Sequence, residues 1–101
     1  MYGTLARMRP RPGREQEVVA LFDEWWRERG PTVPGARQGY VFRPEGQAGE
    51  LVAVAVFADR ESYRANAADP QQDAWYQRLR AELEADPAWE DGDFLSPHTV
   101  A

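Results

Sequence analysis

The sequence contains no cysteine, no lysine and a single histidine. Without cysteine, the chain can form no disulfide, no thiolate metal site and no cysteine nucleophile. The one histidine, His98, stands near the C-terminus, where a lone histidine does not make a metal site and no nucleophile and acid complete a catalytic triad. The sequence therefore predicts no metal site. The lack of lysine is typical of GC-rich codon usage and indicates nothing about function.

Long apolar runs are also missing. The longest uncharged run, residues 51–58, is far shorter than the roughly 20 residues that a membrane-spanning helix needs, and the first residues do not form a basic and then apolar leader. We therefore expect a cytoplasmic protein with no membrane partner. The net charge of −5 and the lack of lysine argue against a nucleic-acid partner.

The chain does contain enough apolar material for a packed core. Hydrophobic residues make up 43% and aromatic residues 12% of the 101 residues, which is typical of a globular domain and not of a disordered chain. A chain of this length fits one domain, and no internal repeat is present. We therefore expect a single domain over residues 1–101.

The first third of the chain predicts a strand followed by a helix. Residues 2–9 alternate with the period of a strand. Residues 14–29 carry apolar side chains at helical spacing, in an unusually wide stripe. Because Trp25 and Trp26 are adjacent, we expect one to pack in the core and the other to meet a partner subunit or a pocket rim. Prolines and glycines in residues 30–35 then predict a loop.

Two further strands predict a hairpin. Residues 37–43 alternate, with Tyr40 and Phe42 on one face, and residues 51–57 (LVAVAVF) are apolar on both faces. Proline and glycine residues between the two strands predict the turn that joins them.

Two aspartates mark helix starts in the second half of the chain. Asp59 can cap a short helical turn that carries Tyr63. Asp69 is followed by Pro70, and proline is favoured at the first helical position. The chain therefore predicts a short helix and then a longer one.

The longer helix predicts a buried face and a defined end. It places Trp75, Leu79 and Leu83 on one side, and we expect it to end at Asp86 and Pro87. The residues that follow carry scattered apolar side chains among charges, which favours a last edge strand.

The order strand, helix, strand, strand, helix, strand predicts an α+β fold. With right-handed crossovers it gives a ferredoxin-like βαββαβ sandwich, in which two helices cover one face of a four-stranded antiparallel sheet. The other face would expose Tyr40, Phe42 and one side of residues 51–57. A second copy packed sheet to sheet with twofold symmetry is the simplest cover, so we expect a homodimer. A ligand pocket between helices and sheet could account for part of the apolar surface.

Four segments resemble the antibiotic biosynthesis monooxygenase-like (ABM) domain, a group of small dimeric α/β-barrel proteins. They read YGTLARMRPRPGREQEVVALFDEW, GYVFRP, LVAVAVFADRESYRANAADPQQDAWYQRL and ADPAWEDGDF. The similarity covers nearly the whole chain and is most specific from Leu51 to Trp75. The resemblance implies a homodimer whose two sheets form an α/β barrel, with a small-molecule pocket between the sheet and the helices of each subunit.

Members of this family include cofactor-free oxygenases of aromatic polyketides, quinol monooxygenases and haem-degrading enzymes. The residues that haem-degrading members rely on correspond here to Ala6, Asn66 and Trp75 or Tyr76. None of them matches, and no axial haem ligand is present, so we expect no cofactor. Quinol-type members often carry histidine where Asn66 and Gln71 stand, which argues against that activity.

Oxygenation without a cofactor needs an electron-rich substrate, such as a phenolate or a quinol anion, that can pass an electron to oxygen. The site then needs aromatic walls and one or two polar groups. Asn66, between the Tyr63 turn and the Asp69 cap, is the candidate catalytic residue. Tyr40, Tyr63 and Trp75 are the candidate substrate-binding residues. Simpler roles are open as well: Asn66 could bond a turn backbone, and the aromatic residues could be core packing.

Two functions follow from this pattern. The first is a cofactor-independent monooxygenase, or a related oxidoreductase, that acts on a small aromatic or quinol substrate. The alternative is a non-catalytic homodimer that binds a small molecule in the same pocket, and the missing histidines favour it. The RNA recognition motif shares this order of elements, but its aromatic ribonucleoprotein sequence is absent.

Overall fold

The computed structural model describes all 101 residues. Its elements in chain order are β1 (Tyr2–Met8), α1 (Glu15–Glu24), the π-helical turn η1 (Trp25–Arg29), the 3₁₀ turn η2 (Gly30–Thr32), β2 (Ala36–Phe42), β3 (Leu51–Phe57), α2 (Arg60–Ala67), α3 (Pro70–Ala81) and β4 (Ala88–Asp93). The predicted last edge strand is therefore present as β4.

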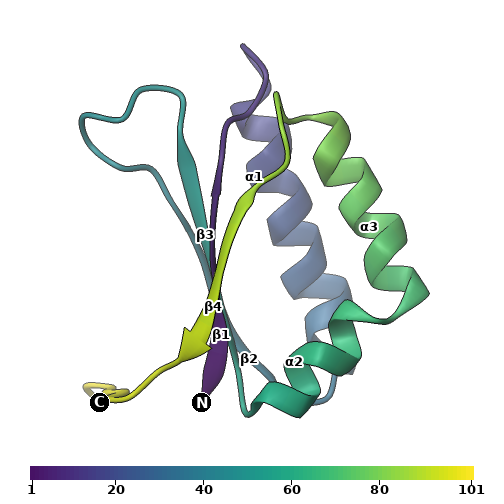
Figure 1. Ribbon diagram of the computed structural model, residues 1–101, viewed down its shortest axis with the longest axis vertical. Helices are drawn as coiled ribbons and strands as arrows, with labels where there is room; N and C mark the ends of the chain where they lie inside the picture. The colour runs from purple at the N-terminus through teal and green to yellow at the C-terminus, as the bar shows by residue number, and fades with distance from the viewer.

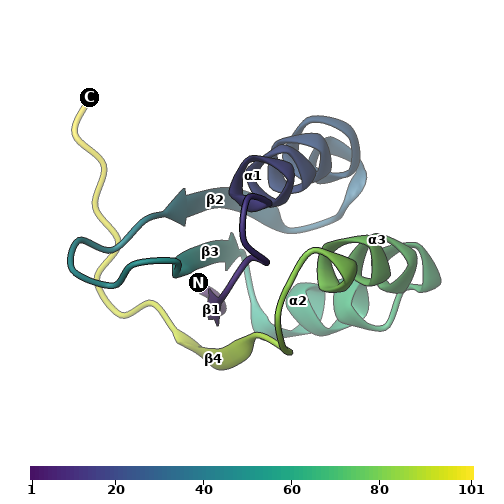
Figure 2. The same cartoon turned by 90° about the horizontal axis from the view of Figure 1, so that it is seen from above.

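The four strands form one antiparallel sheet in the order β2-β3-β1-β4. Figures 1 and 2 show that α1, α2 and α3 all lie on one face of this sheet. The arrangement confirms the predicted α+β, ferredoxin-like βαββαβ sandwich. None of the helices combines the length and the apolar character needed to cross a membrane.

Both aspartate caps are confirmed. The Asp59 carboxylate accepts a hydrogen bond from the backbone N–H of Ser62 at 2.8 Å, and the Asp69 carboxylate accepts one from Gln71 N–H at 2.8 Å. Each bond satisfies a backbone donor that the first helical turn leaves free. The caps start α2 and α3 only ten residues apart, so the second crossover is two short helices instead of one.

The end of the first helix differs from the prediction. Its last five residues, Trp25–Arg29, form a π-helical turn, and the 3₁₀ turn Gly30–Thr32 replaces the first part of the predicted loop. A π turn holds one more residue than an α turn. The backbone therefore stays helical as far as Thr32, although Pro31 lies within this segment.

The third helix ends at Ala81, whereas the sequence predicts an end at Asp86. Beyond it the chain pairs with the segment that follows β1, where Leu83 forms an isolated bridge and Glu84 N–H donates to the carbonyl of Arg9 at 2.9 Å. These bonds replace further helical bonds. Leu83 stays fully buried, so the predicted apolar face of this segment is confirmed.

The hydrophobic core lies between the helices and the covered face of the sheet. Val18 of α1 and Leu79 of α3 are fully buried there against Leu51 and Phe57 of β3. The side chains at both ends of the β3 face are therefore large and closely packed.

The other face of the sheet has no helix over it. The strand register sets Tyr40 opposite Val54 and Phe42 opposite Val52, so these four side chains share the uncovered face. Tyr40 is 57% exposed and Phe42 is 55% exposed. The predicted apolar patch is therefore present in part: Tyr40 and Phe42 are exposed, whereas Val52 and Val56 of the same face are buried.

Gly39 lets a helix side chain lie directly on β2. A Cβ atom added at Gly39 would stand 2.1 Å from Cε2 of Trp26, a distance that no pair of non-bonded carbon atoms tolerates. Trp26 therefore occupies the space that any other residue at position 39 would fill. The same addition at Gly92 of β4 meets nothing within 4 Å.

We predict that Gly39→Ala lowers the free energy of unfolding by about 1–3 kcal/mol, because the new methyl group forces Trp26 or β2 to move. Urea unfolding followed by far-ultraviolet circular dichroism measures this change. Gly92→Ala is the matched control and should stay close to the wild type. Equal stability of the two variants would contradict the close approach of Trp26.

Candidate functional site

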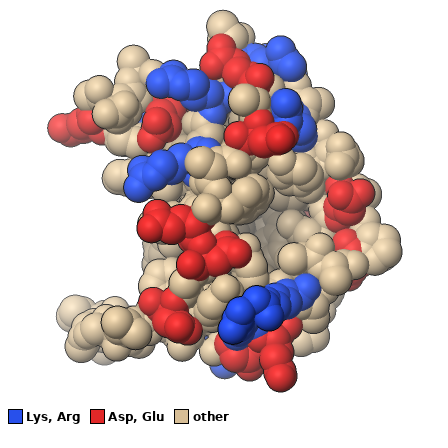
Figure 3. All heavy atoms as spheres, in the orientation of Figure 1, with Lys and Arg blue, Asp and Glu red and all other residues tan.

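A cavity of about 430 Å³ lies between the sheet and the helices. Figure 3 shows it as a hollow in the surface between β4 and the helices α2 and α3, and acidic side chains stand on its β4 side. A volume of this size is typical of a small-molecule site.

The floor of the cavity consists of small side chains. Thr4 and Ala6 of β1 and Ala53 and Ala55 of β3 line it, and the register pairs Thr4 with Ala55 and Ala6 with Ala53. Larger residues on these strands, such as Leu51, pack into the core beside the cavity. The space is open because the centre of the covered face lacks large side chains.

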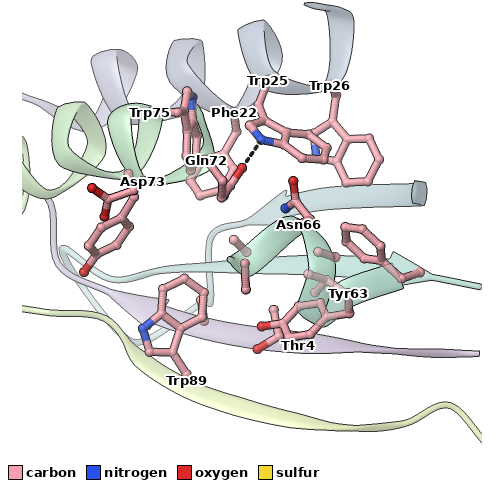
Figure 4. A pocket seen from close by; sticks show the side chains of 17 residues that line it. Thr4, Phe22, Trp25, Trp26, Tyr63, Asn66, Gln72, Asp73, Trp75 and Trp89 are labelled. Atoms are coloured by element: carbon pink, nitrogen blue, oxygen red, sulfur yellow. Dashed lines mark hydrogen bonds between the residues drawn. The ribbon is translucent and has the colours of Figure 1, made fainter. Parts of the chain in front are cut away.

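Every tryptophan of the chain lines the cavity. The chain contains four, and they come from the π turn, α3 and β4: Trp25, Trp26, Trp75 and Trp89. Figure 4 shows them around the space. The rings of Trp25 and Trp26 meet edge to face with their centroids 4.7 Å apart, a favourable geometry for aromatic pairs.

The π turn explains how two adjacent tryptophans reach one cavity. The expectation that one of them packs in the core and the other meets a pocket is confirmed, and both rings also line the same space. Trp25 is buried and packs in the core, while Trp26 lies over Gly39. The wider turn changes the angles between successive side chains, and π-helical turns often occur at functional sites.

Asn66 of α2 points to the cavity with a defined amide orientation. Its Oδ1 accepts a hydrogen bond from Nη2 of Arg29 at 2.9 Å, so the side chain does not bond a turn backbone. Guanidinium groups only donate hydrogen bonds. The oxygen of the amide must therefore face Arg29, and Nδ2 lies on the other side.

Trp75 of α3 serves the core and the cavity wall together. It is buried, and its indole N–H donates to the carbonyl of Leu21 at 3.0 Å. Its ring meets Phe22 edge to face at a centroid distance of 5.2 Å. Core packing and substrate binding, the two roles that the sequence leaves open for Trp75, are therefore compatible.

Tyr63 of α2 lies at the β1 side of the cavity. Its hydroxyl donates to the Asp91 carboxylate of β4 at 3.1 Å, and Figure 4 shows it close to the hydroxyl of Thr4. Burial, with the Asp91 charge adding to it, raises the pKa of Tyr63 to about 12. The phenol is therefore neutral at physiological pH.

Tyr40, the remaining candidate, does not reach this cavity. The β2 register directs Gly39 and Val41 to the covered face, so Tyr40 lies on the uncovered face with half of its surface exposed. The expectation that Tyr40 binds the substrate is therefore wrong for this cavity, because Tyr40 is not among the residues that line it. Asn66, Tyr63 and Trp75, in contrast, are brought together around it.

Two polar groups of the site were not predicted from the sequence. Gln72 of α3 accepts a hydrogen bond from the indole N–H of Trp25 at 2.6 Å, and Asp73 is the one carboxylate that lines the cavity. The signal available for Gln72 was its position about one turn before Trp75 on the same helix. His98 is exposed in the tail and contacts Ser96 at 2.7 Å. The structure holds no group of three or more side chains arranged to bind a metal.

Comparisons with known proteins place this fold. The family model described as antibiotic biosynthesis monooxygenase matches residues 1–86. No curated protein matches the chain.

Solved structures of the same fold cover almost the whole chain. SnoaB from Streptomyces nogalater, a cofactor-independent oxygenase, is 22% identical over 98% of this chain and 95% of its own, with a TM-score of 0.72. Rv0793 from Mycobacterium tuberculosis is 19% identical over 97% and 98%, with a TM-score of 0.79. NE2512 from Nitrosomonas europaea, a protein of unknown function, is 15% identical over 99% and 94%, with a TM-score of 0.78.

The family model spans both helical crossovers and the first three strands of the sheet, including the residues of α2 and α3 that line the cavity. The chain belongs to the antibiotic biosynthesis monooxygenase family.

Proposed function

We propose that this chain is a cofactor-independent monooxygenase, or a related oxidoreductase, that acts on a small aromatic or quinol substrate. One observation carries the proposal: a cavity with tryptophan walls that contains the amide of Asn66. Aromatic walls suit a flat ring, and one polar group in an apolar space can orient it. The similarity of fold to SnoaB, a cofactor-independent oxygenase, supports the same reading.

The proposed reaction uses the electron-rich character of the substrate itself. The bound substrate loses a proton to water at the cavity mouth, and its anion passes an electron to O₂. A bond then forms between the ring carbon and oxygen, and the peroxide takes up the proton to give a hydroperoxide. Loss of water from that carbon leaves a carbonyl, so one oxygen atom enters the product and the other leaves as water.

In this scheme the residues of the cavity hold and desolvate the anion. Asn66 Nδ2 is placed to donate to the substrate oxygen on which negative charge collects, and such donors act strongly where water is excluded. Trp75 provides a wall for the ring. Tyr63 is a neutral hydrogen-bonding group and not a base, because its pKa is about 12.

A homodimer is part of the proposal. The uncovered sheet face, with Tyr40 and Phe42 more than half exposed, is of the kind that a second copy covers. We propose that residues 1–101 form one domain and that two such domains pack with these faces together, which keeps the helices and the cavity on the outside of the sheets.

The alternative is a homodimer that binds an aromatic molecule without turnover. One observation favours it: no histidine or lysine lines the cavity, and the only carboxylate there, Asp73, lies at an exposed position. A substrate that is not already acidic would then find no buried base. Oxygen uptake distinguishes the two functions.

We predict saturable oxygen uptake by metal-stripped protein with at least one member of a panel of hydroquinones, naphthoquinols and polyphenols. Asn66→Ala should lower kcat by about 100-fold, because one donor to the developing anion is lost. An oxygen electrode measures the rate, and heat-denatured protein gives the autoxidation background.

Gln16→Ala is the control for this prediction, since it removes an amide from an exposed position on α1. Full activity of folded Asn66→Ala would remove Asn66 from the site. If the wild type consumes no oxygen with any member of the panel, the binding function is supported and the enzyme function is refuted.

We predict that Tyr63 ionises only near pH 12 in the folded chain. Above pH 10 the unfolded chain releases the Tyr63 proton while the folded chain keeps it up to about pH 12. The contribution of Tyr63 to stability is therefore complete below pH 10 and is lost as the pH rises to about 12. Near-ultraviolet tyrosinate absorbance should show a late step that Tyr63→Phe and urea-unfolded wild type both lack. A late step that persists in Tyr63→Phe would refute the assignment.

We predict that charges on the uncovered face break the dimer. Val54→Asp, opposite Tyr40 in the register, should give a monomer or an unfolded chain by light scattering. Tyr40 stands at an exposed position, so Tyr40→Arg should yield a folded monomer. Gln16→Arg, on the far side of the helices, is the control and should stay dimeric. A dimer that survives Tyr40→Arg and Val54→Asp would exclude this face as the interface.

A further inference from the structure

Arg29 fixes which way the Asn66 amide points. Its Nη2 donates to Asn66 Oδ1 at 2.9 Å, and its Nη1 donates to Gln71 Oε1 at 2.9 Å. The Asp69 carboxylate lies 3.7 Å from Nη2, and the guanidinium carbon stands 6.0 Å from the centre of the Trp25 ring. The arginine is mostly buried, at 17% side-chain exposure, so four neighbours on three elements hold it in place.

Trp25 does the same for Gln72. Its indole N–H donates to Gln72 Oε1 at 2.6 Å. An indole nitrogen, like a guanidinium, can only donate. The choice between the two orientations of an amide, which is normally inferred from its partners, has one answer in both cases.

In both amides the oxygen accepts a hydrogen bond from a donor-only group, so the NH₂ group points the other way. Asn66 and Gln72 both line the cavity, and no hydrogen bond within the chain uses Asn66 Nδ2 or Gln72 Nε2. Figure 4 shows both side chains on the helix side of the space. On the sheet side, the neutral Tyr63 hydroxyl already donates its hydrogen bond to the Asp91 carboxylate. The helix side of the cavity therefore offers two amide donors, and the Asp73 carboxylate, at an exposed position on α3, is the one charged acceptor that lines it.

We propose that Arg29 and Trp25 are positioning residues that fix Asn66 and Gln72 as donors, so that the cavity selects planar aromatic ligands by a carbonyl or phenolate oxygen. This inference rests on the proposed function only in using the same cavity. It names the ligand class by its acceptor oxygen, because a ring whose only polar group is a donor leaves both amide NH₂ groups unpaired. A site built around fixed donors rejects a ligand that leaves them unpaired.

The geometry also assigns a role to the π turn. Trp25 and Arg29 are its first and last residues, so one local backbone feature carries both positioning groups. Arg29 keeps a buried Nε with no partner, which costs stability. The guanidinium is held by Nη2 and Nη1, which donate to Asn66 and Gln71.

The test uses two bicyclic probes of opposite polarity in equilibrium dialysis with the full chain. 1,4-Naphthoquinone offers only acceptors, and indole offers only a donor. Asn66→Asp replaces the NH₂ group with a carboxylate oxygen of the same shape, which Arg29 keeps ionised. We expect the Kd of naphthoquinone to rise by about tenfold and the Kd of indole to fall.

Arg29→Met tests positioning separately from contact. Without the guanidinium the Asn66 amide can turn over, so naphthoquinone should bind several-fold more weakly and indole more tightly. A merely structural role would weaken both probes together. Gln71→Glu is the matched control, because it changes an amide to a carboxylate next to Arg29 but outside the cavity.

Opposite changes for the two probes in both variants support the inference. Parallel changes, unchanged affinities, or no binding of naphthoquinone to the wild type would overturn it. Turnover is not part of the measurement. Selective binding in a protein that consumes no oxygen would refute the proposed enzyme function and support this inference. Oxygen uptake without selectivity for acceptor ligands would support the enzyme function and refute this inference.

Discussion

The site depends on a constraint in the middle of the sheet. Between the large core residues at the ends of β3, the covered face carries Ala53 and Ala55, with Thr4 and Ala6 beside them on β1. Helices cannot sink to fill this depression, because Leu79 and Val18 already rest on the large residues around it. The space that remains is walled by tryptophans, and every polar group of the site is placed relative to it.

The secondary structure could be predicted because its causes are local. Alternation in β1 and β3 and the aspartate caps at Asp59 and Asp69 depend on neighbours within a few residues, and all of them are confirmed. Alternation also shows that Tyr40 and Phe42 share a face. It does not show which residues line the pocket, because that depends on the pairing of β2 with β3, and Tyr40 is therefore a substrate-binding candidate from the sequence that the structure keeps out of the cavity.

The polar part of the site lay beyond local reasoning. The bond from Trp25 to Gln72 spans 47 positions and the bond from Arg29 to Asn66 spans 37, so no spacing in the sequence signals either one. The π turn was hidden for a different reason. An α-helix and a helix with one wider turn have nearly the same pattern of apolar residues, and only packing against β2, where Gly39 admits Trp26, distinguishes them.

The gathering of all four tryptophans around one space has an optical consequence. In most proteins the indole emission mixes signals from unrelated places. Here the whole of the indole signal of the folded chain comes from the lining of the cavity, and the edge-to-face pair of Trp25 and Trp26 couples two of the rings. A change in tryptophan emission at constant fold therefore reports on the surroundings of this cavity, together with the solvent at Trp89, which is 50% exposed.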